Sequence, residues 1–237
     1  MNTRLLRISS RILFFLGVLI GFALAVIAIW NSIEATNYFF QGVKYAPFGG
    51  LRCPLMIAPT EKGTVAAVFN NPTDGEDHFV YRAEISRKAF SARQIDDQVA
   101  VSAHQSRSVQ LTVDAQDIDL LFFILVKLTI LPNSVHPSQE AVCGMMVVNL
   151  LGLTGAQITG AALLLSFLGM AVGLGLWQRT STAADQDRPR VVRALGIAVI
   201  LSMFTSALGW WIIAVVLAII TILLLFISLR SVIVKLP

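Results

Sequence analysis

The sequence GTVAAVFNNPTDGEDHFVYRAEIS, residues 63–86, decides the fold of the central part of this chain. Apolar side chains recur at every second position in residues 65–69 and again in residues 79–85, which is the pattern of a strand with one buried face. Between these two runs lies Asn70-Asn-Pro-Thr-Asp-Gly75, a dense group of turn-forming residues. The stretch therefore predicts two strands separated by a turn.

Further strand-like runs lie on both sides of this stretch. They are residues 52–58, 98–103, 109–113, 120–130 and 141–149, of which the run at 98–103 has the weakest pattern. About six or seven strands at this spacing, with turn residues between them, are typical of a two-sheet structure. The sequence therefore predicts a small antiparallel β-sandwich over residues 51–153.

The strand and turn pattern resembles the bacterial immunoglobulin-like and fibronectin-III-like accessory domains. In those domains a strand ends in Asn-Pro-Thr or Asn-x-Gly, as residues 63–86 do, and a later strand precedes an acidic turn, as in SRSVQLTVDAQDID, residues 106–119. The resemblance covers residues 51–149 and implies a binding or spacing module without catalysis. The chain departs from antibody-type domains because no Trp lies between Trp30 and Trp177, so their core Trp is missing.

The segments that flank the predicted sandwich are apolar. The chain is 56% hydrophobic and 14% charged, whereas soluble domains carry about 25% charged residues. The uncharged run of residues 12–33 is long enough to cross a bilayer as a helix. A cleaved signal peptide is the alternative, although its apolar region is shorter, about 7–15 residues. Aromatic side chains then predict a membrane-interface segment over residues 34–50.

Three more helices are expected after the sandwich. Residues 155–178 form the second candidate span, and residues 179–193 form a basic loop. The following uncharged stretch would reach about 54 Å as one straight helix, far more than a bilayer core of about 30 Å. We therefore expect a helical hairpin with spans at residues 194–208 and 211–229.

The distribution of charge predicts the orientation in the membrane. The N-terminus (residues 1–11), the loop at residues 179–193 and the C-terminus (residues 230–237) together carry nine Lys and Arg against two acidic residues. The predicted sandwich and its aromatic lead-in carry nine Lys and Arg against twelve acidic residues. Because basic loops stay in the cytoplasm, we expect both termini inside the cell and the sandwich on the periplasmic or extracytoplasmic side of an inner membrane.

Two cysteines and four glycines are candidate structural residues. Cys53 and Cys143 lie near the first and last strands, and in an exported domain they predict a disulfide. Two free buried thiols are the alternative. The pairs Gly17/Gly21 and Gly169/Gly173 each have the GxxxG spacing that lets helices approach closely. The alternative is that glycine is simply common in membrane helices.

The sequence contains few candidates for chemistry. Two groups have side chains of the types that metals use: His136, Cys143, Met145 and Met146 for copper, and Asp114, Asp117 and Asp119 for calcium. The first group lacks the tight ligand order of copper sites, and the second is more commonly an acidic turn. The sequence has no Ser/His/Asp set, Gly-rich phosphate loop or CxxC motif. It therefore predicts no catalytic residue, no cofactor and no metal.

One strand run is apolar on both of its faces, although a two-layer sandwich buries only one. The candidate interface is Leu121, Phe123 and Leu125 on the second face, together with Tyr38, Phe39 and Phe40. Three coverings stay open: a partner protein, the bilayer surface, and the chain's own residues 38–48.

These observations together predict a non-enzymatic accessory or scaffold subunit of a larger membrane complex. Its partners would be membrane lipid and other membrane subunits, in a hetero-complex rather than a homo-oligomer, and not nucleic acid. The alternative is a ligand- or metal-binding sensor or enzyme that uses the outer domain. A transporter is disfavoured because the predicted spans contain no ionisable residue.

Overall fold

The computed structural model describes residues 3–40, 45–133, 137–180 and 188–233 of the chain. These residues divide into two compact units. Residues 1–29 and 159–237 make up the helical unit, and residues 30–158 make up the β unit. The last two turns of the first helix therefore belong to the β unit.

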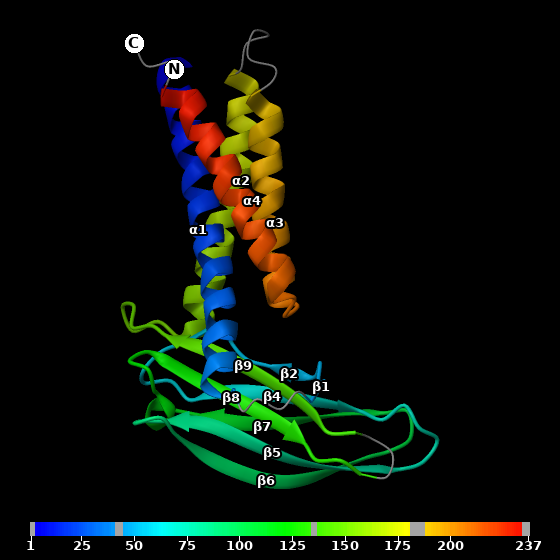
Figure 1. Cartoon of the computed structure of the whole chain (residues 1–237). Coiled ribbons are helices and arrows are strands. Elements are labelled where there is room, and N and C mark those ends of the chain that lie inside the picture. The colour runs from blue at the N-terminus through cyan, green and yellow to red at the C-terminus, as the bar shows by residue number, and fades with distance from the viewer. Residues whose placement is uncertain (1–2, 41–44, 134–136, 181–187, 234–237) are drawn as a thin grey trace. The chain divides into compact units, whose positions relative to one another are not determined.

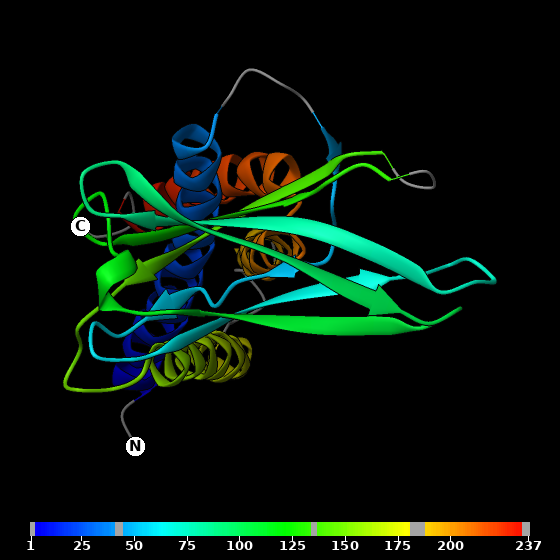
Figure 2. The same cartoon turned by 90° about the horizontal axis from the view of Figure 1, so that it is seen from below.

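The β unit is built from two sheets (Figures 1 and 2). Its strands are β1 (Ala46–Pro47), β2 (Leu51–Arg52), β3 (Met56–Ile57), β4 (Gly63–Asn70), β5 (Asp77–Arg87), β6 (Ser91–Val101), β7 (Ser106–Val113), β8 (Phe123–Ile130) and β9 (Gln139–Val147). The larger sheet has the order β1-β9-β8-β5-β6, with β3 also paired to β9, and the smaller sheet has the order β2-β4-β7. The two strands that residues 63–86 predict are present as β4 and β5, in different sheets.

The core of the β unit lies between the inner faces of the two sheets. Alternate residues of each long strand are buried there, and they include Val65 and Phe69 of β4, Tyr81 of β5, Leu111 of β7 and Leu128 of β8. The alternation in the sequence has this cause, since successive side chains of a strand point to opposite faces.

The larger sheet is mixed, so the prediction of a purely antiparallel sandwich is wrong in this respect. β1 and β3 both pair with β9 in parallel, while β2, which lies between them in the chain, pairs with β4 of the smaller sheet. These strands have two residues each, because Pro47, Gly49–Gly50 and Pro54 interrupt the run. The chain therefore crosses between the two sheets twice from β1 to β3, and once more to reach β4.

Several predicted strands differ in extent from those observed: the run at 52–58 is divided into β2 and β3, and β9 begins and ends two residues earlier than predicted, while β6 and β8 differ as follows. β6 runs over 11 residues, whereas the sequence predicts only a weak strand near its end. Residues 91–98 lack an apolar alternation because they lie on an edge strand and are mostly exposed. β8 begins at Phe123 rather than at residue 120. Leu120 and Leu121 have φ values of 46° and 74°, which end the extended conformation before β8.

The helices are α1 (Thr3–Tyr38), α2 (Gly155–Thr180), α3 (Arg188–Ala207) and α4 (Trp211–Ile233). Ile8–Tyr38 of α1 and Gly155–Arg179 of α2 are long and apolar enough to cross a membrane, by length and composition only. Gly209, with φ of 75°, lies in the turn between α3 and α4. The helical hairpin predicted from the sequence, with spans at residues 194–208 and 211–229, has its turn at the same position. Within the helical unit, all four helices contribute to one apolar cluster around Phe14 and Leu195.

Candidate functional site

A disulfide and an ion-pair network close the two open sides of the sandwich. The predicted disulfide between Cys53 and Cys143 is confirmed, with the two Cα atoms 6.1 Å apart. It joins the β2–β3 connection to β9, and so links the smaller sheet to the larger one on one side. Its sequence separation of 90 corresponds to about 4–5 kcal/mol of stabilisation in the chain-entropy account.

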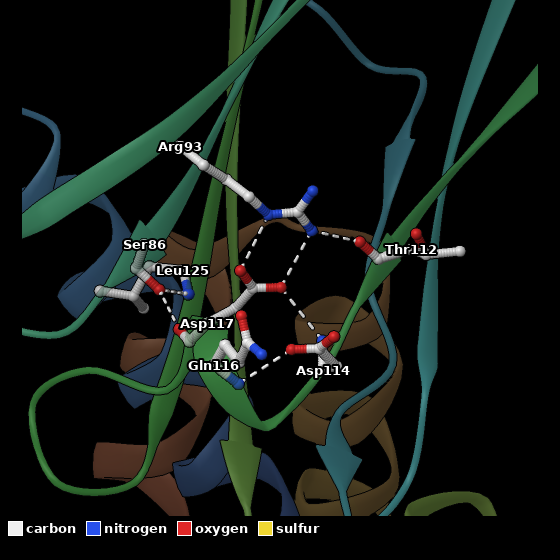
Figure 3. Close-up of polar contacts among 7 residues, drawn as sticks. All are labelled: Ser86, Arg93, Thr112, Asp114, Gln116, Asp117 and Leu125. Atoms are coloured by element: carbon white, nitrogen blue, oxygen red, sulfur yellow. Dashed lines mark hydrogen bonds and ion pairs between the residues drawn. The ribbon is translucent and has the colours of Figure 1, made fainter.

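Arg93 of β6 closes the opposite side (Figure 3). Its guanidinium group forms two bonds with the buried Asp117 carboxylate, Nε to Oδ1 at 2.8 Å and Nη2 to Oδ2 at 2.9 Å. Nη2 also donates to the main-chain carbonyl of Thr112 on β7. The hydrogen bond to Asp117 raises the pKa of Arg93 above its ordinary value, so the guanidinium group stays protonated. Arg93 thus connects the edge strands β6 and β7 of the two sheets.

The acidic turn is held by protein donors. The Asp117 carboxylate also accepts the main-chain N–H of Asp114 at 3.0 Å, and Asp114 in turn accepts the N–H of Gln116 at 2.8 Å (Figure 3). Asp119 accepts from the main-chain N–H of Phe90 at 2.9 Å. These contacts form an acidic turn capped by its own side chains. Among the described residues no group of three or more His, Cys, Asp or Glu is placed to hold a metal.

The predicted copper group is only partly visible. Met145 is fully buried in the sandwich core, and Cys143 is in the disulfide. His136 lies outside the described residues.

The glycines of the two GxxxG pairs lie at close contacts inside the helical unit. A Cβ atom on Gly17 would lie 2.7 Å from the main-chain N of Met170, and one on Gly173 would lie 2.6 Å from that of Phe14. Gly169 faces Gly17 in the same way, whereas a Cβ on Gly21 would meet side chains of α2 and α3. These glycines therefore let helices of this chain pack closely against one another, so the two GxxxG surfaces are already used by contacts within the chain.

The apolar outer face of β8 and β9 is covered by the end of α1. Phe123 and Leu125 are buried against Ala35 and Phe39. The Tyr38 hydroxyl donates to the main-chain carbonyl of Ser91 at 2.7 Å and lies 3.0 Å from the Asp119 carboxylate. The chain's own segment thus covers this face, which is one of the three coverings that the sequence left open. Leu121 and Phe40 remain exposed, at 93% and 77%, and Leu121 lies in a loop rather than on the strand.

A cleft of about 470 Å³ opens at the end of the sandwich where β4 ends and β9 begins. Its lining consists of Phe48, Gly49, Gly50, Arg52, Val68, Phe69, Asn70, Pro72, Phe79, Ile130 and Gln139. The lining therefore combines the chain crossing from β1 to β2 with the ends of strands from both sheets.

Aromatic rings form the apolar part of the cleft. The ring of Phe69 lies 5.5 Å from that of Phe48 and 5.6 Å from that of Phe79, between ring centroids. Phe69 is fully buried and Phe79 nearly so, while Phe48 is half-buried. The buried rings therefore support Phe48, whose half-buried ring is the aromatic surface that a ligand can reach.

Backbone constraints place the two walls of the cleft. The main-chain N–H of Phe48 donates to the carbonyl of Glu140, and Gly50 accepts from the N–H of Val68, both at 2.9 Å. A Cβ on Gly50 would overlap the Val68 carbonyl oxygen, so this approach requires glycine. On the other wall, the buried Asn71 side chain donates to the carbonyls of Gly75 and Val101. These bonds hold the neighbouring Pro72 in place.

The polar groups of the cleft are few. Arg52 and Asn70 are exposed, and Gln139 is half-buried. Arg52 is the one charged residue among the described lining residues. A cation beside two amides and an aromatic surface can bind an apolar group that carries a carboxylate or a carbonyl oxygen.

The sequence predicts neither this cleft nor a buried cation. Phe48 falls within the predicted membrane-interface segment, and the adjacent Gly49–Gly50 is the one local sign of the close approach. Lys127 is only 2% exposed, on the outer face of β8, with its Nζ 3.5 Å from a Glu84 oxygen and 3.6 Å from a Glu140 oxygen. The one charged residue within the apolar run of β8 is the sequence feature that indicates this buried cation.

Comparison with known proteins leaves the family open. No protein-family model matches the sequence, and no curated protein matches it. Parts of three solved enzymes are similar in structure. They are a cycloisomaltooligosaccharide glucanotransferase from Paenibacillus sp. (13% identity, TM-score 0.34, covering 44% of this chain and 14% of that one), a β-glucuronidase from Bacteroides uniformis (8%, 0.33, 41% and 12%) and a β-glucosidase from Erythrobacter marinus (16%, 0.29, 41% and 15%). The chain spans at most 15% of these enzymes, and likenesses at these TM-scores support no inference about its fold or activity.

Proposed function

We propose that this chain is a non-enzymatic accessory subunit of a larger membrane complex. In this proposal four membrane helices anchor an immunoglobulin-like domain on the extracytoplasmic side of an inner membrane, and the cleft beside Phe48 receives a segment of a partner subunit. The observation that carries the proposal is the cleft, because its volume and its mixture of aromatic and polar groups fall in the range of binding sites.

The membrane part of the proposal is supported by the surfaces of the helices. Large apolar side chains are exposed on α2, α3 and α4, among them Phe167, Leu168, Phe204, Ile220 and Phe226. Exposed apolar surface of this extent is costly in water and expected in lipid. The excess of basic residues at the termini and between α2 and α3 supports a cytoplasmic location for these segments. The disulfide supports an oxidising compartment for the β unit.

The strand order supports the immunoglobulin-like part of the proposal. In that fold, strands C, F and G form one sheet, and strands A, B and E lie in the other. Here β5, β8 and β9 are neighbours in the larger sheet, while β2, β4 and β7 are neighbours in the smaller one. In the proposed immunoglobulin-like fold these strands, taken in chain order, would correspond to C, F and G and to A, B and E.

The proposed occupant of the cleft is an extended segment with an apolar side chain and an acidic residue. The apolar group would pack on the half-buried ring of Phe48, which the buried ring of Phe69 supports from behind. The acidic group would pair with Arg52, the one charged lining residue among those described. The lining carries amide and guanidinium groups that bind a ligand rather than transfer protons at neutral pH, which supports a binding role.

Charge reversal at the cleft tests this function. Arg52→Glu is expected to abolish co-purification of the partner subunit after mild detergent extraction from native membranes. Lys88→Glu, an equal change at an exposed turn away from the cleft, is expected to leave co-purification unchanged. Equal recovery of the partner with both variants would refute the cleft as the binding site.

A small-molecule sensor is the second candidate, since about 470 Å³ also suits a compact ligand. Native mass spectrometry of the purified chain distinguishes the two. A stoichiometric small adduct that Arg52→Glu removes would favour the sensor, and a protein adduct would favour the subunit.

A further inference from the structure

The two ends of the β unit differ in the chemistry of their connections. At one end, which we call the free end, the strands are joined by residues 71–76, 102–105 and 131–138. None of the exposed large apolar side chains lies in the described part of these connections. Polar contacts are found there instead, such as that of His104 with Asp74 at 2.9 Å.

The opposite end, the tether end, exposes large apolar side chains. Leu121 and Leu151 are 93% and 92% exposed, and Phe90, Phe122 and Leu150 are also exposed. They come from three different connections, β5–β6, β7–β8 and β9–α2. Figure 2 shows that the strand connections gather at two opposite ends of the sheets.

The backbone fixes two of these leucines in outward positions. Leu121 has φ of 74° and Leu151 has φ of 51°, a conformation that costs energy for a residue with a Cβ. The main-chain N–H of Val147 donates to the carbonyl of Phe122 at 2.7 Å, which joins the loop of Leu121 to the strand that leads to Leu151. The two exposed loops are therefore neighbours on one ordered end of the sandwich.

The tether end is also where both candidate membrane spans join the β unit. The Glu61 carboxylate accepts the main-chain N–H of Gly155, the first residue of α2, at 2.7 Å and that of Ala58 at 3.0 Å. The side chain of Asn31 in α1 donates to the carbonyl of Leu55 at 2.9 Å. Only three residues separate Leu151 from Gly155, so the chain places Leu151 within about 14 Å of the start of α2.

We propose that Leu121 and Leu151 insert into the bilayer interface and seat the tether end of the β unit on the lipid surface. The polar layer of a bilayer is about 5–7 Å deep on each side, which matches loops that enter it without crossing. The lipid is the occupant because the connection to α2 holds Leu151 next to a candidate span, whereas the free end carries polar connections. This inference rests on the proposed membrane anchoring.

Fluorescence quenching in vesicles tests the inference with the full chain. A cysteine replaces Leu121, Leu151 or, as the control at the free end, Ser102, and each is labelled with an environment-sensitive fluorophore. All three side chains are exposed, so the substitutions leave the core intact. The chain is reconstituted in vesicles of phosphatidylcholine and phosphatidylglycerol, with and without lipids that carry a nitroxide near the top of the acyl chain.

Labels at residues 121 and 151 are expected to shift to shorter emission wavelength and to lose about half or more of their intensity to the nitroxide lipid. The label at residue 102 should lose less than about one tenth. Quenching at residues 121 and 151 no greater than at residue 102, in vesicles that contain the protein, would overturn the lipid contact while leaving the membrane anchor standing. A chain that fails to float with the vesicles would overturn both the anchor and this inference.

Discussion

Alanine at Gly173 of α2 is expected to weaken the contact between α1 and α2, whereas alanine at Gly175 of the same helix is not. A Cβ atom at Gly173 would lie 2.6 Å from the main-chain N of Phe14 and 2.7 Å from its Cα. At Gly175 nothing lies within 4 Å of the corresponding position. The two substitutions are chemically identical and two residues apart, so each controls for the other.

The size of the effect follows from these distances. Non-bonded carbon atoms pack at about 3.5–4.0 Å, so the backbones of α1 and α2 must separate by roughly 1 Å in the Gly173 variant. No change of rotamer relieves the clash, because the atoms of Phe14 belong to the main chain and Cβ. Overpacking of this kind costs about 1–3 kcal/mol. Both variants gain a similar helix propensity, about 1 kcal/mol or less, so their difference isolates the clash.

Unfolding of the full chain in detergent micelles measures this difference. Trp177 is buried with its ring 6.2 Å from that of Phe14, between centroids, so its fluorescence reports on this contact during a titration with sodium dodecyl sulfate. Gly173→Ala should be less stable than Gly175→Ala by about 1–3 kcal/mol. Free energies of unfolding that agree within about 0.5 kcal/mol would refute the close approach of the two helices.

Three further predictions concern the β unit. Replacing Cys53 and Cys143 with Ser should cost about 4–5 kcal/mol, seen as roughly thousandfold faster hydrogen exchange in β5 and β8; less than tenfold would contradict the account. Asp117→Asn should cost about 1.5–3 kcal/mol in the same assay, whereas Asp96→Asn, in an exposed pair with Arg82, should change little. Burial, and then the Asp97 carboxylate, raise the pKa of Tyr81. The unfolded chain therefore ionises first as pH rises through about 10, and the free energy of unfolding should fall there less steeply in Tyr81→Phe than in the native protein.

The local pattern of the sequence predicted the strands that bury one face. β4, β5 and β7 carry alternating apolar residues because their inner faces meet one core, and the disulfide partners were the only two cysteines in the chain. The turn at residues 70–75 was also visible, since Asn71 holds it through its own side chain. These features depend on neighbours in the sequence or on residue types with few alternatives.

The remaining features depend on contacts between distant segments. The sequence left open what covers the apolar outer face of β8, because the residues that cover it, Ala35 and Phe39, lie more than 80 positions earlier. The parallel pairing of β1 and β3 with β9 also had no local signal, because each is two residues long. The cleft forms only where the crossing at Phe48–Gly50 meets the ends of both sheets.

Photo-crosslinking from the cleft in living cells tests the central claim most directly. A photoreactive residue replaces Gln139, which lines the cleft and is half-buried, and a matched one replaces Lys88 at the exposed turn. The account predicts a single adduct with one membrane protein from position 139, lost when Arg52→Glu is added, and none from position 88. A chain that stays at 25.8 kDa after irradiation, or an adduct that persists with Arg52→Glu, would contradict it.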